Sequence, residues 1–285
     1  MAHSAKPNTM KAAVVQMVSG QDVDANLSRV DGLLASLEHQ AVDCVVLPEM
    51  FACLGVKNQV ELARTRFHAS DVLARLGDWA KRLQTTLVAG SVPVLDEANA
   101  QKVRAACCVF DPQGQLIARY DKIHLFDVDV ADNKGRYRES DTFSPGDGPV
   151  VAPLAVQGAQ RKLGLSICYD LRFPELYQIY QAKGCELITV PSAFTYQTGQ
   201  AHWEVLLRAR AIETQSFVLA ANQGGIHEDG RQTWGHSMIV APNGDVLAQL
   251  DTPGDGVAIA ELDFEQLKQL RQAMPIQQHK RLSLN

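Results

Sequence analysis

The sequence has too few cysteines for a disulfide-stabilised protein. Six cysteines are spread through 285 residues, and no two of them form a Cys-x-x-Cys pair. The eight histidines show no His-x-x-x-His pair and no Cys/His group with zinc spacing. These absences argue against a disulfide framework and against a structural or catalytic metal. We expect most of the cysteines to be small buried hydrophobic side chains.

Long apolar runs and an excess of basic residues are also missing. No run approaches the roughly 18 apolar residues that span a bilayer, so we expect no membrane segment. The formal charge is −5, from 27 basic and 32 acidic residues. Nucleic-acid-binding proteins usually carry a basic excess, so this balance argues against such a partner. Residues 1–9 lack the apolar stretch of a secretory signal; we expect a loose extension there and a cytoplasmic protein.

Strand and helix patterns alternate along the chain, and no linker-like segment divides them. Expected strands are 11–17, 42–47, 87–94, 105–110, 115–120, 162–167, 186–190, 216–221, 237–240, 245–250 and 256–262. Expected helices are 22–39, 71–84, 173–183, 200–215 and 264–273, with turns at 111–114 and 241–244. Residues 124–150 are expected to form a long loop, and loops of this length in a compact domain tend to be functional. The pattern predicts a single α/β domain over residues 10–274 with mixed sheets, followed by a polar, basic tail over 275–285.

One cysteine has a context that differs from the other five. Cys168 ends an apolar strand, and Pro174 shortly after it suits the first turn of a helix. A cysteine at a strand-to-helix turn is expected to lie near helix N-terminal amides, which lower a thiol pKa and stabilise an oxyanion. The pattern favours a nucleophile, with a buried core cysteine as the alternative.

A cysteine nucleophile needs a base, and histidine is the usual one. Three histidines lie near strand ends or helix starts, so position excludes none of them: His124, His202 and His236. Three charged residues are further candidates, namely Glu49 after an apolar strand, Lys122 after a hairpin strand, and Glu139 in the long loop. Each has the alternative of being an ordinary surface or salt-bridge residue, and sequence spacing alone does not bring them together.

Three segments resemble the signature regions of the nitrilase superfamily of carbon–nitrogen hydrolases. They are Leu47-Pro48-Glu49, residues 120–125 around Lys122, and residues 164–175 around Cys168. The resemblance covers about residues 10–280, and the cysteine segment is its most specific part. It implies an α-β-β-α sandwich of two mixed sheets that pairs into a homodimer or higher homo-oligomer. It also implies a small-molecule amide substrate and no cofactor.

The resemblance assigns roles to these residues. Cys168 would be the nucleophile, and Glu49 the general base and later the general acid. Lys122 would stabilise the oxyanion beside the backbone N–H of Tyr169, and Glu139 would orient the lysine or the leaving group. These residue types suit amide hydrolysis, which needs a nucleophile, oxyanion donors and an acid that protonates departing ammonia.

Three further segments resemble the branch of this superfamily that holds omega-amidases and deaminated-glutathione amidases: residues 191–195, 198–213 and 235–238. Their sequences are closer to those of the deaminated-glutathione amidases. Both kinds of enzyme must bind a substrate carboxylate. Arg172 is the candidate, because a guanidinium binds carboxylate bidentately, with a salt bridge to Glu175 or Glu213 as the alternative. Phe194 and Thr198 are expected to line the pocket. A nitrilase, and a non-enzymatic protein of the same fold, are the other functions considered.

Overall fold

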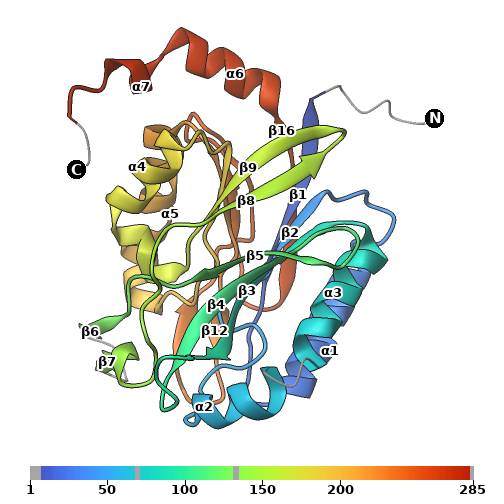
Figure 1. Cartoon of the computed structure of the whole chain (residues 1–285), viewed down its shortest axis with the longest axis vertical. Helices are drawn as coiled ribbons and strands as arrows, with labels where there is room; N and C mark the ends of the chain where they lie inside the picture. The colour runs from blue at the N-terminus through green and yellow to red at the C-terminus, as the bar shows by residue number, and fades with distance from the viewer. Residues whose placement is uncertain (1–7, 68–70, 131–134, 283–285) are drawn as a thin grey trace.

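Two mixed β-sheets lie face to face, and helices cover the outer face of each (Figure 1). The computed structural model describes residues 8–67, 71–130 and 135–282. Its layers are helices, sheet, sheet and helices, which confirms the expected α-β-β-α sandwich in a single domain. No helix among the described residues is long and apolar enough to cross a membrane.

The first sheet combines the N-terminal half of the chain with one C-terminal strand. Its order is β16 (Gly256–Asp263), β1 (Thr9–Gln16), β2 (Cys44–Val46), β3 (Thr86–Leu95), β4 (Val103–Phe110) and β5 (Leu116–Asp121). β1, β2 and β3 are parallel, and the other strands are added antiparallel to their neighbours. Along β1, Val14 faces the core between the sheets, whereas Val15 packs beneath α1 (Val23–Ala35) and α3 (Asp71–Leu83).

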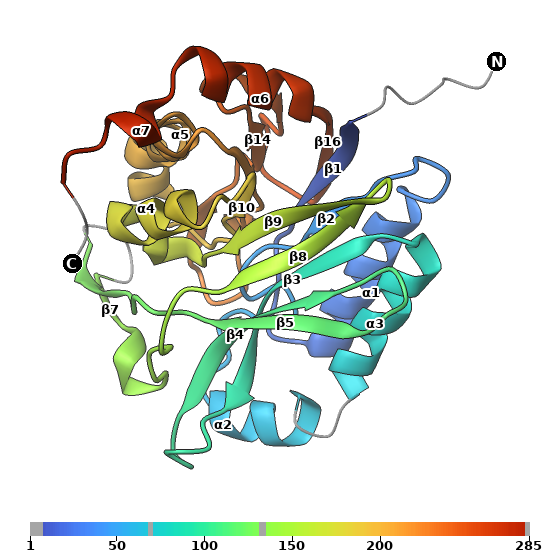
Figure 2. The same ribbon diagram turned by 45° about the horizontal axis from the view of Figure 1, so that its top comes forward.

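The second sheet has the same plan. Its order is β15 (Val246–Gln249), β14 (Met238–Val240), β11 (Phe217–Ala220), β10 (Leu187–Thr189), β9 (Ala159–Leu165) and β8 (Val151–Val156). The central strands β9, β10 and β11 are parallel, and antiparallel strands flank them. The helices α4 (Pro174–Ala182) and α5 (Tyr196–Thr214) cover its outer face, opposite α1 and α3 (Figure 2).

Both predicted hairpins are present. The predicted turn 111–114 lies between β4 and β5, and the predicted turn 241–244 lies between β14 and β15. The first turn packs closely against α3, because a Cβ on Gly114 would lie 2.6 Å from the carbonyl oxygen of Gly77. Gly114 also has a φ of +81°, a backbone conformation that glycine adopts without steric cost.

The structure corrects several expected boundaries. The helix expected over 22–39 ends at Ala35, and the one expected from residue 200 begins at Tyr196. The expected loop over 124–150 contains the hairpin of β6 (Asp127–Asp129) and β7 (Arg136–Arg138), followed by a 3-10 turn at Glu139–Asp141. Sequence patterns missed β8, the hairpin of β12 (Gly224–Ile226) and β13 (Gln232–Trp234), and the helical segment α2 (Gln59–Leu62) with its π-helical continuation Ala63–Phe67. β12, β13 and α2 have only three or four residues, too few to show a clear hydrophobic period. β8 has six residues whose burial alternates, a period-2 pattern that the sequence analysis overlooked.

The two ends of the chain bear on the expected domain limits. β1 begins at Thr9, and residues 1–7 of the expected extension lie outside the described residues. After β16, the helix α6 (Phe264–Ala273) leads to α7 (Ile276–His279), which lies in the expected tail. The domain limits given above stay predictions.

Candidate active site

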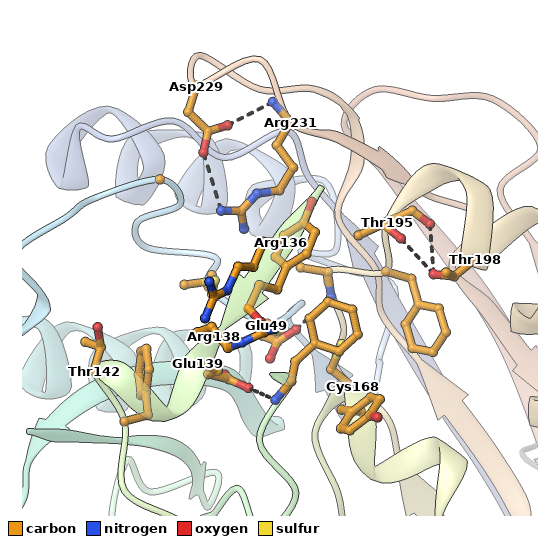
Figure 3. Close-up of a pocket in the computed structure, with 18 of the residues that line it drawn as sticks. Glu49, Arg136, Arg138, Glu139, Thr142, Cys168, Thr195, Thr198, Asp229 and Arg231 are labelled. Carbon is orange, nitrogen blue, oxygen red and sulfur yellow. Dashed lines mark hydrogen bonds and ion pairs between the residues drawn. The ribbon is translucent and has the colours of Figure 1, made fainter. Parts of the chain in front are cut away.

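Strand ends from both sheets meet at one edge of the sandwich. β5 lies two antiparallel steps from β3, so its carboxyl end reaches the same edge as the carboxyl ends of β2 and β3. Glu49 follows β2, Lys122 follows β5, and Cys168 follows β9 of the opposite sheet. The topology therefore brings together three residues that lie far apart in the sequence, and all three line one cavity. Figure 3 shows Glu49 and Cys168 in this cavity.

Lys122 is held between two carboxylates. Its Nζ donates to Glu49 Oε1 at 2.9 Å and to Glu139 Oε2 at 2.8 Å. Only 2% of Lys122 is exposed, so its ammonium group is almost fully removed from water. Burial alone would lower the pKa of Lys122, but the charges of Glu139 and Glu49 raise that pKa well above its ordinary value. The lysine is therefore a fixed positive charge.

Backbone amides orient both carboxylates. Glu49 Oε2 accepts from the N–H of Ala193 at 2.9 Å, so one oxygen of Glu49 faces the lysine and the other faces the chain after β10. Glu139 Oε2 accepts from the N–H of Phe126 at 2.7 Å. Burial raises the pKa of Glu139. Each acidic group has a single defined orientation, which a positioned proton carrier requires.

The structure corrects the expected environment of Cys168. The residues 168–172 form a short 3-10 turn, and the α-helix begins only at Pro174. Burial, together with the charge of Glu49, raises the pKa of the Cys168 thiol well above its ordinary value; the positive charge of Lys122 acts in the opposite direction. The expected lowering of the pKa by helix amides was therefore wrong. The free protein holds a protonated thiol beside a carboxylate, so this site needs a base to activate it.

Asp170 is a buried carboxylate that the sequence analysis missed. Its Oδ2 accepts from the hydroxyl of Tyr120 at 2.6 Å and from the N–H of Ile167 at 2.8 Å. Its Oδ1 accepts from the N–H of His124 at 3.1 Å and lies 2.7 Å from Nδ1 of that ring. Asp170 thus joins the turn that carries Cys168 to the segment that carries Lys122. The only signal in the sequence is its position two residues after the cysteine.

Arg172 has no carboxylate partner among the described residues. Its Nη1 lies 3.3 Å from Nδ1 of His202, and its guanidinium lies 5.3 Å from the ring centre of Phe194. Neither expected salt bridge forms: Glu213 pairs instead with Arg210 at 3.0 Å, and Glu175 contacts no cation in the described part of the chain. The charge of Arg172 is therefore available to an anionic ligand.

One cavity of about 1010 Å³ contains the residues predicted for the site. Those that line it are Glu49, Lys122, Glu139, Cys168, Tyr169, Arg172, Phe194 and Thr198. The three candidate histidines do not line it, so they are not candidates for the base in this arrangement. Sequence analysis missed a further group of charged lining residues from β7 and the β12–β13 turn, because their strands were not predicted: Arg136, Arg138, Asp229 and Arg231.

The described residues contain no group of three or more His, Cys, Asp or Glu side chains placed to hold a metal ion. The two carboxylates of the cavity are bridged by the ammonium group of Lys122 instead. The ammonium group of Lys122 therefore supplies the positive charge between the two carboxylates.

Comparison with known proteins identifies the family. Residues 11–272 match the family model of carbon–nitrogen hydrolases. The chain belongs to the carbon–nitrogen hydrolase family. It is therefore a hydrolase of carbon–nitrogen bonds other than peptide bonds.

Similar members of the family include named amidases. The chain is 40% identical over 279 residues to deaminated glutathione amidase of Yersinia enterocolitica, covering 94% of this chain and 92% of that protein. It is 36% identical over 277 residues to omega-amidase NIT2 of Bos taurus, covering 97% and 96%. Among solved structures, Nit3 of Saccharomyces cerevisiae, a member of branch 10 of the nitrilase superfamily, superposes with a TM-score of 0.81 at 30% identity, covering 99% of this chain and 100% of that chain.

Proposed function

We propose that this hydrolase cleaves the amide of a linear, carboxylate-bearing α-keto acid, with deaminated glutathione as the preferred substrate. The observation that carries the proposal is the placement of Cys168 beside Glu49 and a charge-fixed Lys122, in a cavity where the guanidinium of Arg172 has no carboxylate partner among the described residues. The similarity to named deaminated glutathione amidases and omega-amidases supports the same choice.

The first half of the reaction forms a thioester. Glu49 takes the proton from the Cys168 thiol as the sulfur attacks the amide carbon and a C–S bond forms. Lys122 and the backbone N–H of Tyr169 stabilise the negative charge on the carbonyl oxygen. When the intermediate collapses, the C–N bond breaks and Glu49 returns its proton to the departing nitrogen.

The second half releases the acid. Glu49 takes a proton from water, whose oxygen attacks the thioester carbon, and the C–S bond breaks. The Cys168 sulfur recovers a proton from Glu49, so one water is consumed for each amide bond cleaved. Glu139 holds Lys122 through two short contacts and acts as the positioning residue for the oxyanion donor.

The two candidate substrates differ in their leaving group. The sequence led us to expect ammonia as the leaving group of both substrates, and this holds for omega-amides such as α-ketoglutaramate. The scissile amide of deaminated glutathione is substituted by cysteine and glycine, so its cleavage releases a dipeptide amine. In both, the acyl half carries a carboxylate next to the keto group. We assign that carboxylate to Arg172, with Phe194 and Thr198 beside it on the cavity wall.

A substrate panel tests the proposal. Because deaminated glutathione and α-ketoglutaramate yield the same keto acid, their kcat/KM values are compared by keto-acid release, and succinamate, glutamine and a simple nitrile by ammonia release. We expect the highest kcat/KM for deaminated glutathione, a lower value for α-ketoglutaramate, and no turnover of the nitrile. Preference for α-ketoglutaramate would favour the omega-amidase alternative, and nitrile turnover would favour a nitrilase. A chelator should leave all rates unchanged.

We further propose a cytoplasmic homodimer. Support for association comes from apolar side chains exposed on α5, where Val205 is 67% and Ile212 is 48% exposed. Sedimentation of the purified protein tests the oligomeric state, and a monomer at micromolar concentration would contradict it. Cell fractionation tests the location.

A further inference from the structure

The cavity extends well beyond the residues that carry the proposed chemistry. Its volume of about 1010 Å³ is at the upper end of the range for pockets that hold drug-sized ligands, about 300–1,000 Å³. A five-carbon amide such as α-ketoglutaramate fills only a small part of this space. The remaining wall is formed by β7, the β12–β13 turn and the segment before α2. A second portion of the substrate has room to bind there.

The charge of this remaining wall is positive. Its charged lining residues are Lys57, Arg136, Arg138 and Arg231 on the basic side, and Asp141 and Asp229 on the acidic side. Arg138 is committed to the β6–β7 hairpin, because it bonds Asp129 at 2.9 Å and two backbone carbonyls. Arg231 lies 3.4 Å from Asp229. The excess of basic residues on this wall favours the binding of an anionic group of the ligand.

The third guanidinium of this wall, that of Arg136, has no hydrogen-bond or ion-pair partner among the described residues, although it lines the cavity. In Figure 3, Arg136 lies between the Asp229–Arg231 pair and the glutamates Glu49 and Glu139. Its backbone is fixed by pairing with Asp129 across the hairpin, so its approach to the cavity does not depend on a free loop.

The spacing along β7 fits a dipeptide. Arg136 precedes Glu139 by three residues, and Glu139 begins a 3-10 turn, so an extended chain at ~3.3 Å per residue sets an upper limit of about 10 Å between their Cα atoms. Two residues of an extended leaving group span about 7 Å. The side chain of Arg136 is long enough to cover the difference between these two lengths. The carboxylate at the far end of a dipeptide therefore falls within reach of Arg136 when the scissile nitrogen is beside Glu139, which shares Lys122 with Glu49.

We propose that Arg136, with Arg231 behind it, binds the terminal carboxylate of a peptide-like leaving group. This rests on the proposed amidase function and deepens it: the cavity binds a substrate with two carboxylates, the acyl one at Arg172 and the leaving-group one at Arg136. The arrangement accounts for a cavity larger than an omega-amide requires. It also gives a physical basis for preferring a substituted amide to one that releases ammonia.

The test compares deaminated glutathione with its glycinamide analogue, which lacks only the terminal charge. We expect the native chain to prefer the carboxylate substrate, mainly through KM. In Arg136→Gln, the ratio of the two kcat/KM values should fall about tenfold, the size expected for a partly exposed charged hydrogen bond. Added salt should reduce the same ratio in the native protein. Arg64→Gln, an exposed arginine outside the cavity, is the matched control and should leave the ratio unchanged.

The outcomes separate this inference from the proposed function. If the native chain cleaves no amide of the series, α-ketoglutaramate included, the proposed function itself fails. If it cleaves α-ketoglutaramate but shows no preference for the terminal carboxylate, the function stands and the subsite is wrong. If Arg136→Gln and Lys57→Gln reduced the ratio of the two kcat/KM values equally, the preference would come from a diffuse field of positive charge. That result would also overturn the assignment to Arg136.

Discussion

The cavity wall has two regions that hold charge in different ways. The catalytic floor, defined as Glu49, Lys122, Glu139 and Cys168, is buried except for the partly exposed Glu139, and its charged groups bond to one another and to backbone amides. In the binding rim, defined as Arg136, Arg172 and Arg231, two of the guanidinium groups have no acidic partner among the described residues. The floor is complete without a ligand, whereas the rim gains its partners from one. Changes in the floor should therefore reduce kcat, and changes in the rim should alter substrate choice.

The largest expected effect is loss of the floor's nucleophile. Cys168→Ala should abolish turnover and leave the melting curve unchanged, because the thiol lies at the cavity and contributes chemistry rather than packing. Intact mass after mixing with substrate should show no acyl adduct. Cys44→Ala, a change in a fully buried cysteine of the first sheet, is the control and should retain activity at some cost in stability. Retained activity in Cys168→Ala would remove the nucleophile assignment.

Removal of the fixed positive charge comes next. Lys122→Ala should reduce kcat about 10²- to 10³-fold with a smaller change in KM, the usual loss for one oxyanion donor. The variant also leaves two buried carboxylates without their cation, so a lower melting temperature is expected. Glu49→Gln keeps the shape of the site and should reduce kcat as well. A change confined to KM in either variant would place that residue in binding instead.

The variants Glu49→Gln and Lys122→Ala should shift the pKa of the Cys168 thiol in opposite directions. Besides burial, the charge of Glu49 raises its pKa and the charge of Lys122 lowers it. Glu49→Gln should therefore lower the pKa of the thiol, and Lys122→Ala should raise it further. The rate of alkylation by iodoacetamide as a function of pH, followed by intact mass, measures both shifts. Shifts of the same sign would show that Cys168 does not sense these two charges.

The floor was more predictable from sequence than the rim, for a physical reason. Glu49, Lys122 and Cys168 lie just beyond the ends of β2, β5 and β9, and their segments carry the resemblance to the nitrilase superfamily that assigned their roles, although spacing alone does not bring them together. Arg136 and Arg231 belong to hairpins with three-residue strands, whose existence depends on packing against the rest of the cavity. The thiol environment was mispredicted because local sequence indicated a helix start, while burial and a distant carboxylate set the pKa.

The smallest expected effect is that of a change at Arg172, which distinguishes substrate selection by this residue from support of the fold. Arg172→Lys keeps the charge but removes the fork that binds carboxylate bidentately. A hydrogen bond to a charged group contributes about 1.5–3 kcal/mol, so preference for an acidic amide over a neutral amide of equal length should fall about 10- to 100-fold. Because no acidic partner in the described structure is lost, the melting temperature should stay near that of the native chain. Arg208→Lys, on the exposed side of α5, provides the control. Equal losses on both amides would mean that Arg172 supports the fold of the site and does not select the substrate.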